Sequence, residues 1–187
     1  MNNSFIEIHD NILTKEDADA IENALLCDQF PWFTQLKTVP KSVEDPRHRE
    51  STWMSHKFIT EGGVVSSENA HIPITLLQFF LKHTKYNYKE VIRINANRTQ
   101  PTFRSPMPTP AHRDQPEDHV VLIYYVMDSD GDTVIYNNEE ERKIIKSVSP
   151  RKNRFLFFSG DYWHASYLPR EHDIRVVVNF NLAPLTV

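Results

Sequence analysis

Residues 174–182 read Ile174-Arg175-Val176-Val177-Val178-Asn179-Phe180-Asn181-Leu182, and every even-numbered position among them is apolar. The odd-numbered positions carry Arg175, Val177, Asn179 and Asn181. Because successive side chains of a strand point to opposite faces, this stretch predicts a β-strand with one apolar and one mainly polar face. Residues 91–97 repeat the pattern, with Ile92, Ile94 and Ala96 alternating with Arg93, Asn95 and Asn97.

Period-two patterning and turn signals continue through the second half of the chain. They predict strands at Val91–Asn97, Pro110–Asp114, His119–Met127, Thr133–Tyr136, Lys143–Val148, Asn153–Phe158, Tyr162–Leu168 and Ile174–Leu182. About eight closely spaced strands with no helix between them exclude a parallel βαβ sheet. They predict an antiparallel barrel or jelly roll.

The first part of the chain predicts helices and loops. Thr14 is a candidate N-cap, with Asp17 at the third helical position, for a helix that buries one face. A second helix is expected from about Pro73 to Lys85. Between the two helices, only one strand near Thr52–Ile59 is indicated. We therefore expect a single domain over residues 1–187, with helical cover and loops in 1–88 and a β core in 89–187.

Two helices with apolar stripes need a sheet face to cover. This favours a sheet whose apolar side lies under the helices and whose polar side lines the mouth of a barrel. An ordinary antiparallel sheet with one face in water is the alternative.

Bulk properties narrow the classes of function. At 40% hydrophobic and 25% charged residues, the chain is typical of globular proteins. A net charge of −4 and a pI near 6.1 give no sign of a nucleic-acid or anionic-membrane partner. The single cysteine, Cys27, excludes a disulfide framework and is expected in the core. No signal peptide or membrane span is visible, so a cytoplasmic location is expected.

His112-Arg113-Asp114 is the first candidate metal-binding motif. On a strand, residues i and i+2 share a face, so the imidazole and the carboxylate could reach one ion. With His164 from a later strand, they would form the two-histidine, one-carboxylate face that is typical of non-haem Fe(II) oxygenases. His48-Arg49-Glu50 fits the same pattern but lacks strand context, and we treat it as a chance match.

Arg175 is the candidate anion anchor, because it lies on the polar face of the last predicted strand. A guanidinium inside a barrel needs an anionic partner, and its planar fork suits a carboxylate. A structural ion pair with Asp173 or Glu171 is the alternative. Arg170 is the other basic residue nearby, but its neighbours place it in a loop.

Residues 90–183 resemble the 2-oxoglutarate/Fe(II)-dependent oxygenases, and within them the prolyl-hydroxylase-like branch. The matching motifs are His112-Arg113-Asp114 (His-x-Asp), Leu122–Val126 (the Tyr-Tyr-Leu strand), Asp130–Thr133 (the Gly-Gly-Glu-Thr turn), Pro150–His164 (the approach to the second histidine) and Arg175–Phe180 (the anchor strand). The resemblance implies a double-stranded β-helix with N-terminal helices packed on one face. It also implies Fe(II), 2-oxoglutarate and O₂, and ascorbate as an optional further cofactor.

The resemblance also assigns roles to residues. His112, Asp114 and His164 are the implied metal ligands and catalytic residues, while Arg175, Tyr125 and Thr133 are the implied contacts of 2-oxoglutarate. The implied reaction hydroxylates a substrate C–H bond and releases succinate and CO₂. Three departures from the family pattern are Asn153 and Asp130 in place of glycines, and an anchor arginine one or two residues further from the second histidine.

Several alternatives stay open at this point. A prolyl residue of a protein or peptide is the substrate that the resemblance suggests, and a small molecule is the alternative. A non-catalytic β-helix binding module and a cupin-type enzyme using His119 or His172 are further readings, although we expect both histidines at the surface. A demethylase of the alkylation-repair type is disfavoured, because the position of its second arginine is Asn181.

The segment Gln100–Pro110 contains four prolines and leads directly to His112. It is either a plain connector or a rim over the substrate entrance, where Arg104 or Arg98 could contact a substrate.

Overall fold

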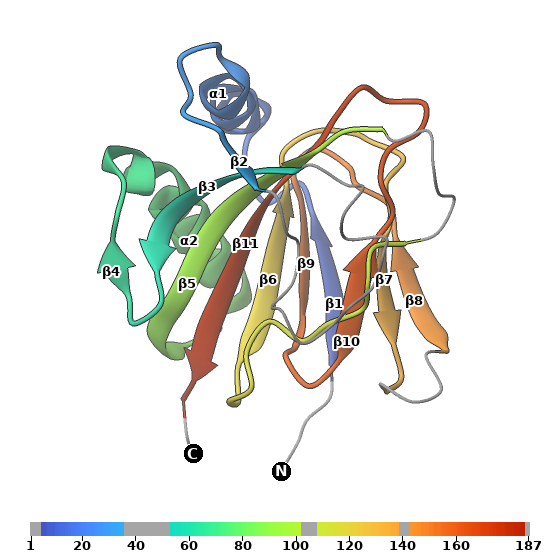
Figure 1. Ribbon diagram of the computed structural model, residues 1–187. Helices are drawn as coiled ribbons and strands as arrows, with labels where there is room; N and C mark the ends of the chain where they lie inside the picture. Colours follow the sequence, from blue (N-terminus) through green and yellow to red (C-terminus); the bar gives the residue numbers. More distant parts are fainter. Residues whose placement is uncertain (1–4, 36–52, 102–107, 139–142, 186–187) are drawn as a thin grey trace.

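A computed structural model describes residues 5–35, 53–101, 108–138 and 143–185, which form two antiparallel sheets and two helices (Figure 1). The large sheet has the order β1 (Ile6–Asp10), β9 (Arg154–Ser159), β6 (Val120–Tyr125), β11 (Arg175–Pro184), β5 (Tyr88–Thr99), β3 (Trp53–Thr60) and β2 (Phe33–Gln35), with β4 (Val64–Val65) also paired to β3. The small sheet has the order β10 (Trp163–Ser166), β7 (Thr133–Tyr136) and β8 (Ile144–Val148). This mainly β architecture agrees with the predicted fold class.

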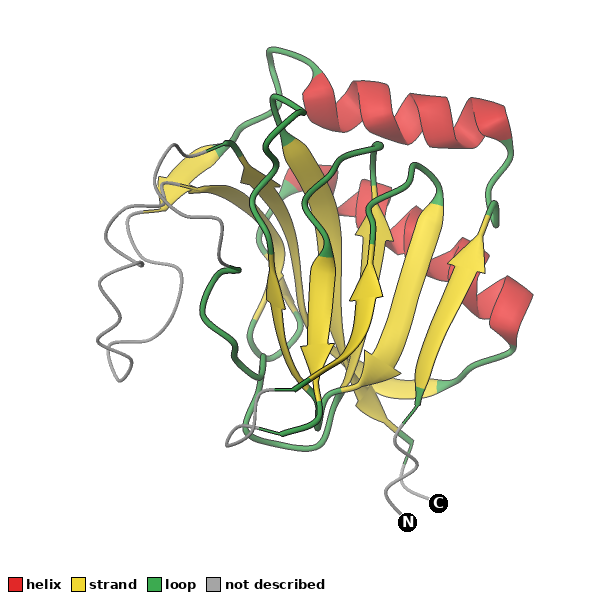
Figure 2. Cartoon of the chain, turned by 90° about the vertical axis from the view of Figure 1, so that its right-hand side faces the viewer, coloured by secondary structure: helices red, strands yellow, loops and turns green. Residues whose placement is uncertain are grey.

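Both helices lie on one face of the large sheet (Figure 2). Helix α1 spans Lys15–Leu26 and helix α2 spans His71–Thr84, preceded by the 3₁₀ turn η2 at Glu68–Ala70. The predicted N-cap of α1 is confirmed, since Thr14 Oγ1 accepts a hydrogen bond from the backbone N–H of Asp17 at 3.1 Å.

The apolar side of β11 forms the main core beneath the helices, as its alternation predicts. Val176, Val178 and Phe180 are fully buried in the same cluster as Leu25 of α1 and Leu76 of α2. In β5 the pattern is interrupted by a register shift, because Arg93 pairs with Asn181 whereas the next pair along the strands joins Val91 to Leu182. Val91, rather than Ile92, therefore packs against this core.

A second core fills the space between the two sheets. Val121, Ile123 and Tyr125 point from β6 toward Ile135 of β7 and Val148 of β8. The odd-numbered side of β11 faces this interior, because Val177 belongs to the same cluster. The predicted division of β11 into a helix-covered side and an interior side is thereby confirmed.

Three sequence-based expectations need correction. Pro110–Asp114 is not a regular strand and pairs with the sheet only through a bridge between His112 and His164. Cys27 is exposed rather than buried, because α1 ends at Leu26 and the chain leaves the sheet there. The first part of the chain is more than helical cover, since β1, β2 and β4 join the large sheet along with the expected strand β3.

The chance match His48-Arg49-Glu50, the residue Arg104 and most of the Gln100–Pro110 segment lie outside the described residues. Arg98 is described, and it pairs with Val176 and Met54. Cross-strand partners share a face, so Arg98 lies on the helix-covered side and not in the interior. Within the described residues, neither helix has the length and apolar character needed to span a membrane.

Candidate metal centre and anion pocket

A reciprocal backbone bridge places the two candidate histidine ligands side by side. The N–H of His112 donates to the carbonyl of His164 at 3.0 Å, and the N–H of His164 donates back at 3.0 Å. Their rings lie 4.6 Å apart between centroids. Because β10 carries His164 and the bridge fixes His112 beside it, the small sheet positions both imidazoles.

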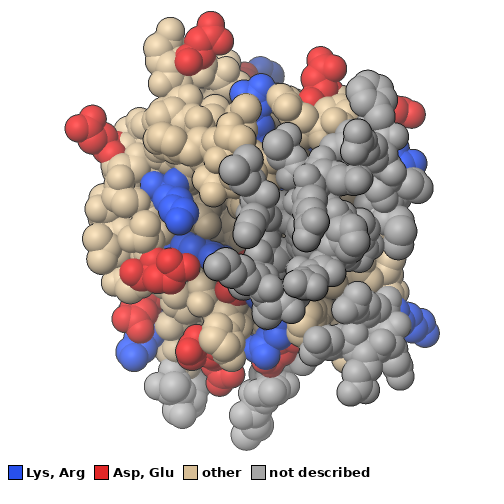
Figure 3. Space-filling model, viewed as in Figure 1, with Lys and Arg blue, Asp and Glu red and all other residues tan. Residues whose placement is uncertain are grey.

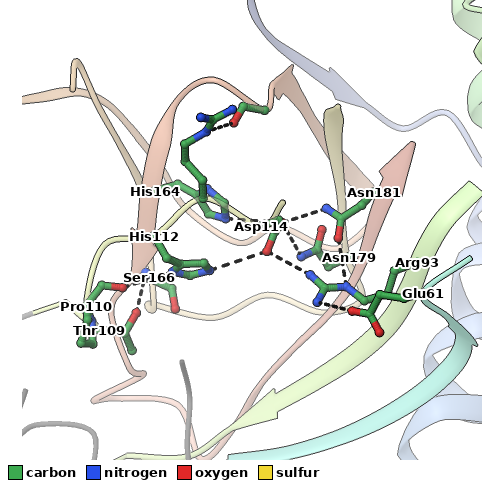
Figure 4. Close-up of polar contacts among 12 residues, drawn as sticks. Glu61, Arg93, Thr109, Pro110, His112, Asp114, His164, Ser166, Asn179 and Asn181 are labelled. Atoms are coloured by element: carbon green, nitrogen blue, oxygen red, sulfur yellow. Dashed lines mark hydrogen bonds and ion pairs between the residues drawn. The ribbon is translucent and has the colours of Figure 1, made fainter. Parts of the chain in front are cut away.

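Asp114 completes the group (Figure 4). Its Oδ1 lies 3.7 Å from Nε2 of His112, and its Oδ2 lies 3.8 Å from Nε2 of His164. One ligand atom from each of the three residues lies within 4.8 Å of the others, and no other group of at least three His, Cys, Asp or Glu in the described residues is arranged this way. Two imidazole nitrogens and one carboxylate oxygen are the donor set of non-haem Fe(II) sites, so the residues fit that ion.

Asp114 is held by three donors from the polar sides of β5 and β11 (Figure 4). Its Oδ2 accepts hydrogen bonds from the Nδ2 amides of Asn181 at 2.8 Å and Asn179 at 3.1 Å. Its Oδ1 accepts from Nη2 of Arg93 at 3.2 Å. Partners of this kind orient a ligating carboxylate and are worth a large part of a site's metal affinity.

The electrostatics of the group suit metal ligation. Burial, together with the nearby charge of His112, lowers the pKa of His164 to about 4, so the ring is neutral near pH 7. Burial alone would raise the pKa of Asp114, but His164, His112 and Arg93 outweigh it and hold that pKa well below its usual range. For His112, Nδ1 lies 3.2 Å from the carbonyl of Pro110, which can only accept, so the Nε2 lone pair is left toward Asp114.

Arg175, Tyr125 and Thr133, for which the resemblance implied contacts with 2-oxoglutarate, lie together in one buried cluster. Arg175 donates from Nη2 to Thr133 Oγ1 at 2.8 Å and from Nε to the carbonyl of Gly131 at 2.7 Å. The Tyr125 hydroxyl donates to the same Thr133 oxygen at 2.7 Å. Burial raises the pKa of Tyr125, so its phenol stays protonated. Two donors, the Arg175 guanidinium and the Tyr125 hydroxyl, therefore converge on the hydroxyl oxygen of Thr133.

No carboxylate neutralises Arg175 within ion-pair distance in the described part of the chain, although its side chain is buried. The alternative pairing with Asp173 or Glu171 is not observed there, and Arg170 is exposed in its loop. A buried guanidinium without a counterion is costly. The cluster is thus a site that a carboxylate from outside the chain would complete.

Thr99 is a contact of this pocket that sequence reasoning missed. It is the cross-strand partner of Arg175, so both side chains lie on the same face. Its buried Oγ1 has no hydrogen-bond partner among the described residues. The pairing of β5 with β11 shows that Thr99 lies beside Arg175, and no pattern in the sequence indicates this.

Asn153 and Asp130 stand where the family pattern has glycine, and each makes local contacts that stabilise its turn or loop. Asn153 adopts a left-handed backbone with φ 62°. Its amide also bridges the backbone of Leu13, accepting from the N–H at 3.1 Å and donating to the carbonyl at 2.8 Å. Asp130 accepts the backbone N–H groups of Arg170, Glu171 and His172, and so ties down the longer loop before the anchor.

His119 and His172, the two other histidines considered as ligands from the sequence, behave differently. His172 is exposed, as expected, and lies 3.1 Å from Asp130 through Nδ1. His119 is buried, which corrects the expectation of a surface position. A Cβ on Gly160 would lie 2.5 Å from the His119 ring, so the ring packs directly on this glycine. Neither histidine belongs to the metal-binding group.

No protein-family model matches this sequence, and no curated protein matches it. Solved structures do match its fold. One is an oxidoreductase of the 2OG-Fe(II) oxygenase family from Burkholderia pseudomallei, with a TM-score of 0.66 at 12% identity over 95% of this chain and 84% of that chain.

Two further structures extend the comparison. A prolyl hydroxylase from Trichoplax adhaerens, in complex with a peptide fragment of the hypoxia inducible factor oxygen degradation domain, matches with a TM-score of 0.64 at 16% identity over 97% of this chain and 84% of that one. The non-heme alpha ketoglutarate dependent epimerase SnoN from nogalamycin biosynthesis matches with a TM-score of 0.67 at 9% identity, over 98% and 80% of the two chains. The chain therefore has the double-stranded β-helix fold of 2-oxoglutarate/Fe(II) oxygenases.

Proposed function

We propose that this chain is an Fe(II)- and 2-oxoglutarate-dependent dioxygenase that hydroxylates a C–H bond. The observation that carries the proposal is the proximity of ligand atoms from His112, Asp114 and His164, all within 4.8 Å of one another, on this fold. Arg175 supports it independently, since it is buried and has no carboxylate within ion-pair distance among the described residues, and a second carboxylate-binding feature is what a dicarboxylic cosubstrate requires.

Each residue has a role in this proposal. Nε2 of His112, a carboxylate oxygen of Asp114 and Nε2 of His164 would hold the ion. Arg175 would pair with the distal carboxylate of 2-oxoglutarate, while the hydroxyls of Tyr125 and Thr133 would donate to it.

The bound iron and cosubstrate supply the oxidative step, in which a substrate C–H, 2-oxoglutarate and O₂ give the alcohol, succinate and CO₂. The protein's own contribution is positioning. Arg93, Asn179 and Asn181 hold the Asp114 carboxylate in place through its two oxygens. The cluster around Arg175 fixes the far end of the cosubstrate in a buried pocket, where its ion pair is strengthened by exclusion of water.

For the substrate, we propose a prolyl residue of a protein or peptide. The likeness to a prolyl hydroxylase bound to a peptide supports this choice. A small molecule is the second candidate, which the likeness to an epimerase from nogalamycin biosynthesis supports.

A binding module that has lost its metal is the rival from another class of function. Such a module would be expected to lack at least one ligand, whereas His112, Asp114 and His164 are all present and adjacent. Anaerobic titration with Fe(II) and then 2-oxoglutarate separates the two readings. The enzyme reading requires a visible metal-to-ligand charge-transfer band in the wild type and its loss in His112→Ala.

Matched arginine variants test the anchor. Arg175→Ala should lose most of its affinity for 2-oxoglutarate, while Arg170→Ala in the exposed loop should titrate like the wild type. A wild type without the band would refute the proposal, as would an unchanged band in His112→Ala. Turnover assays should contain ascorbate, which the resemblance implies as an optional cofactor.

A further inference from the structure

The interior face of the large sheet has an apolar half and a polar half. The small sheet covers the apolar half, where Val121, Ile123 and Leu156 pack against Ile135 and Val148. Beyond β11, the same face continues over β5 and β3, which the small sheet does not cover (Figure 1). The metal-binding group lies at the boundary, because Asp114 is bonded to side chains of β11 and β5.

Carboxamides line this polar half in register. Asn95 of β5 pairs across to Asn179 of β11 and, on its other side, to Lys57 of β3. Asn97 pairs with Val177 and with Ser55 in the next row. Since cross-strand partners share a face, these side chains lie on the same side as the metal-binding group.

Three of these carboxamides have buried acceptors without donors. The Oδ1 atoms of Asn95, Asn97 and Asn179 are buried and have no hydrogen-bond partner among the described residues. For Asn179 the orientation is fixed, because its Nδ2 donates to the Asp114 carboxylate, which can only accept. A buried acceptor left without a donor destabilises the protein. Three together point to a ligand that brings hydrogen-bond donors.

We propose that Asn95, Asn97 and Asn179 form a substrate-binding subsite that accepts the backbone N–H groups of an extended peptide. Asn95 and Asn97 are two residues apart on one strand, and two residues of extended chain span about 6.6 Å. The N–H groups on one side of an extended peptide repeat at that same spacing. Asn179 touches Asp114, so it would hold the substrate segment nearest the metal.

The surroundings of the subsite combine an exposed cation, Lys57, which is the cross-strand partner of Asn95, with an aromatic surface. A cavity of ≈ 480 Å³ lies at its outer end, lined in part by Ser55, Lys57 and Phe33. Phe33 pairs with Ser55 and is 58% exposed, so an aromatic surface is available to an apolar side chain of the substrate. On the side of the molecule drawn in Figure 3, the described Lys, Arg, Asp and Glu side chains are scattered among uncharged residues. Carbonyl acceptors would also repel a carboxylate or phosphate in the same position.

This subsite rests on the proposed oxygenase function, so its test includes a readout that does not need turnover. The probe is a pool of end-blocked pentapeptides containing proline, compared with the same pool methylated at the backbone nitrogens, and with free amino acids. Binding to the protein is measured by equilibrium dialysis and mass spectrometry, in the presence of Fe(II) and 2-oxoglutarate without O₂. The variants are Asn95→Leu, Asn97→Leu and the conservative Asn95→Thr, with Asn23→Leu on α1 as the control.

The wild type should bind the unmethylated pool at least about tenfold more tightly than the methylated pool or the amino acids. Asn95→Leu and Asn97→Leu should lose that preference while keeping the charge-transfer band with 2-oxoglutarate. Asn95→Thr, which retains a hydrogen-bond acceptor, should show part of the wild-type preference for the unmethylated pool. Asn23→Leu should bind both pools as the wild type does.

Equal binding of both pools by the wild type would overturn the subsite, as would an unchanged preference in both leucine variants. Tighter binding of free amino acids than of peptides would do the same. Peptide binding that depends on Asn95 but comes without any band would instead refute the oxygenase function and leave the subsite standing.

Discussion

The carboxamide of Asn181 donates a hydrogen bond of 2.8 Å to Oδ2 of Asp114, joining the last strand of the large sheet to a candidate metal ligand. Asn181 is fully buried and also accepts a hydrogen bond from Nε of Arg93 at 3.0 Å. Asn181 therefore hydrogen-bonds both to the Asp114 carboxylate and to Arg93, the cation that also contacts that carboxylate.

Replacing Asn181 with leucine should weaken Fe(II) binding by about tenfold or more, the usual effect of losing a partner of a metal ligand. The residual bonds from Asn179 and Arg93 would keep the carboxylate near its position. Anaerobic competition with a coloured chelator measures the affinity. Asn23→Leu in the exposed part of α1 is the control, and equal affinities of the two variants would contradict the role given to Asn181.

Thr99→Val should weaken the binding of 2-oxoglutarate and leave that of Fe(II) unchanged. The buried Thr99 hydroxyl lies beside Arg175 and has no partner among the described residues, so a bound carboxylate would be its acceptor. Loss of about 1.5 kcal/mol, the lower end of the range for hydrogen bonds to charged groups, corresponds to a roughly tenfold weaker affinity for 2-oxoglutarate. Titration of the charge-transfer band with 2-oxoglutarate measures the affinity. The matched control is Thr34→Val, because Thr34 lies on β2 and on the opposite face of the large sheet from Thr99.

Asp130→Ala should destabilise the protein by about 1 kcal/mol near neutral pH, because three backbone N–H groups lose a charged acceptor. Burial tends to raise the pKa of Asp130, but these hydrogen bonds lower it to about 2, below its ordinary value of 3.8. A lowered pKa means that the contribution is complete above about pH 4 and is lost as the pH falls toward 2. Urea unfolding at pH 7 and pH 3 should show the difference from the wild type shrinking, whereas a constant difference would count against this origin.

Two substitutions of Asn153 separate the contribution of its left-handed backbone to stability from that of its side-chain hydrogen bonds. Asn153→Gly keeps the left-handed backbone but loses both bonds to Leu13, so it should cost about 1–3 kcal/mol. Asn153→Ala adds a further cost of about 1 kcal/mol, because a Cβ is unfavourable in that conformation. Unfolding by urea should rank wild type, glycine and alanine in decreasing stability. Equal stability of the two variants would show that the backbone conformation contributes nothing.

The sequence predicted those parts of the fold that repeat at short range. Alternation in β11 gave both its faces, and the spacing of Thr14 and Asp17 gave the start of α1. The short edge strand β1 has charged residues and little burial, so its five residues carry too weak a pattern to distinguish it from a loop. Its place in the sheet depends on pairing with β9, which is distant in sequence.

The candidate site divides in the same way. The residue types of His112, Asp114, His164 and Arg175 were sufficient to single them out. The partners of Asp114 were not, because Arg93, Asn179 and Asn181 look like ordinary polar positions until the register is known. His119 was misplaced for a related reason, since only the absence of a side chain at Gly160 makes room for its ring.

The central position of β11 also has a consequence for biosynthesis. This strand inserts between β5 and β6, and it carries Arg175, Asn179 and Asn181. A nascent chain that has not yet released residues 175–184 from the ribosome lacks a complete sheet and two of the three donors that hold Asp114, namely Asn179 and Asn181. Such late, long-range pairing is slow and leaves apolar strands exposed in the meantime. The hydrogen bonds that Asn179 and Asn181 donate to the Asp114 carboxylate can therefore form only after β11 has been synthesised.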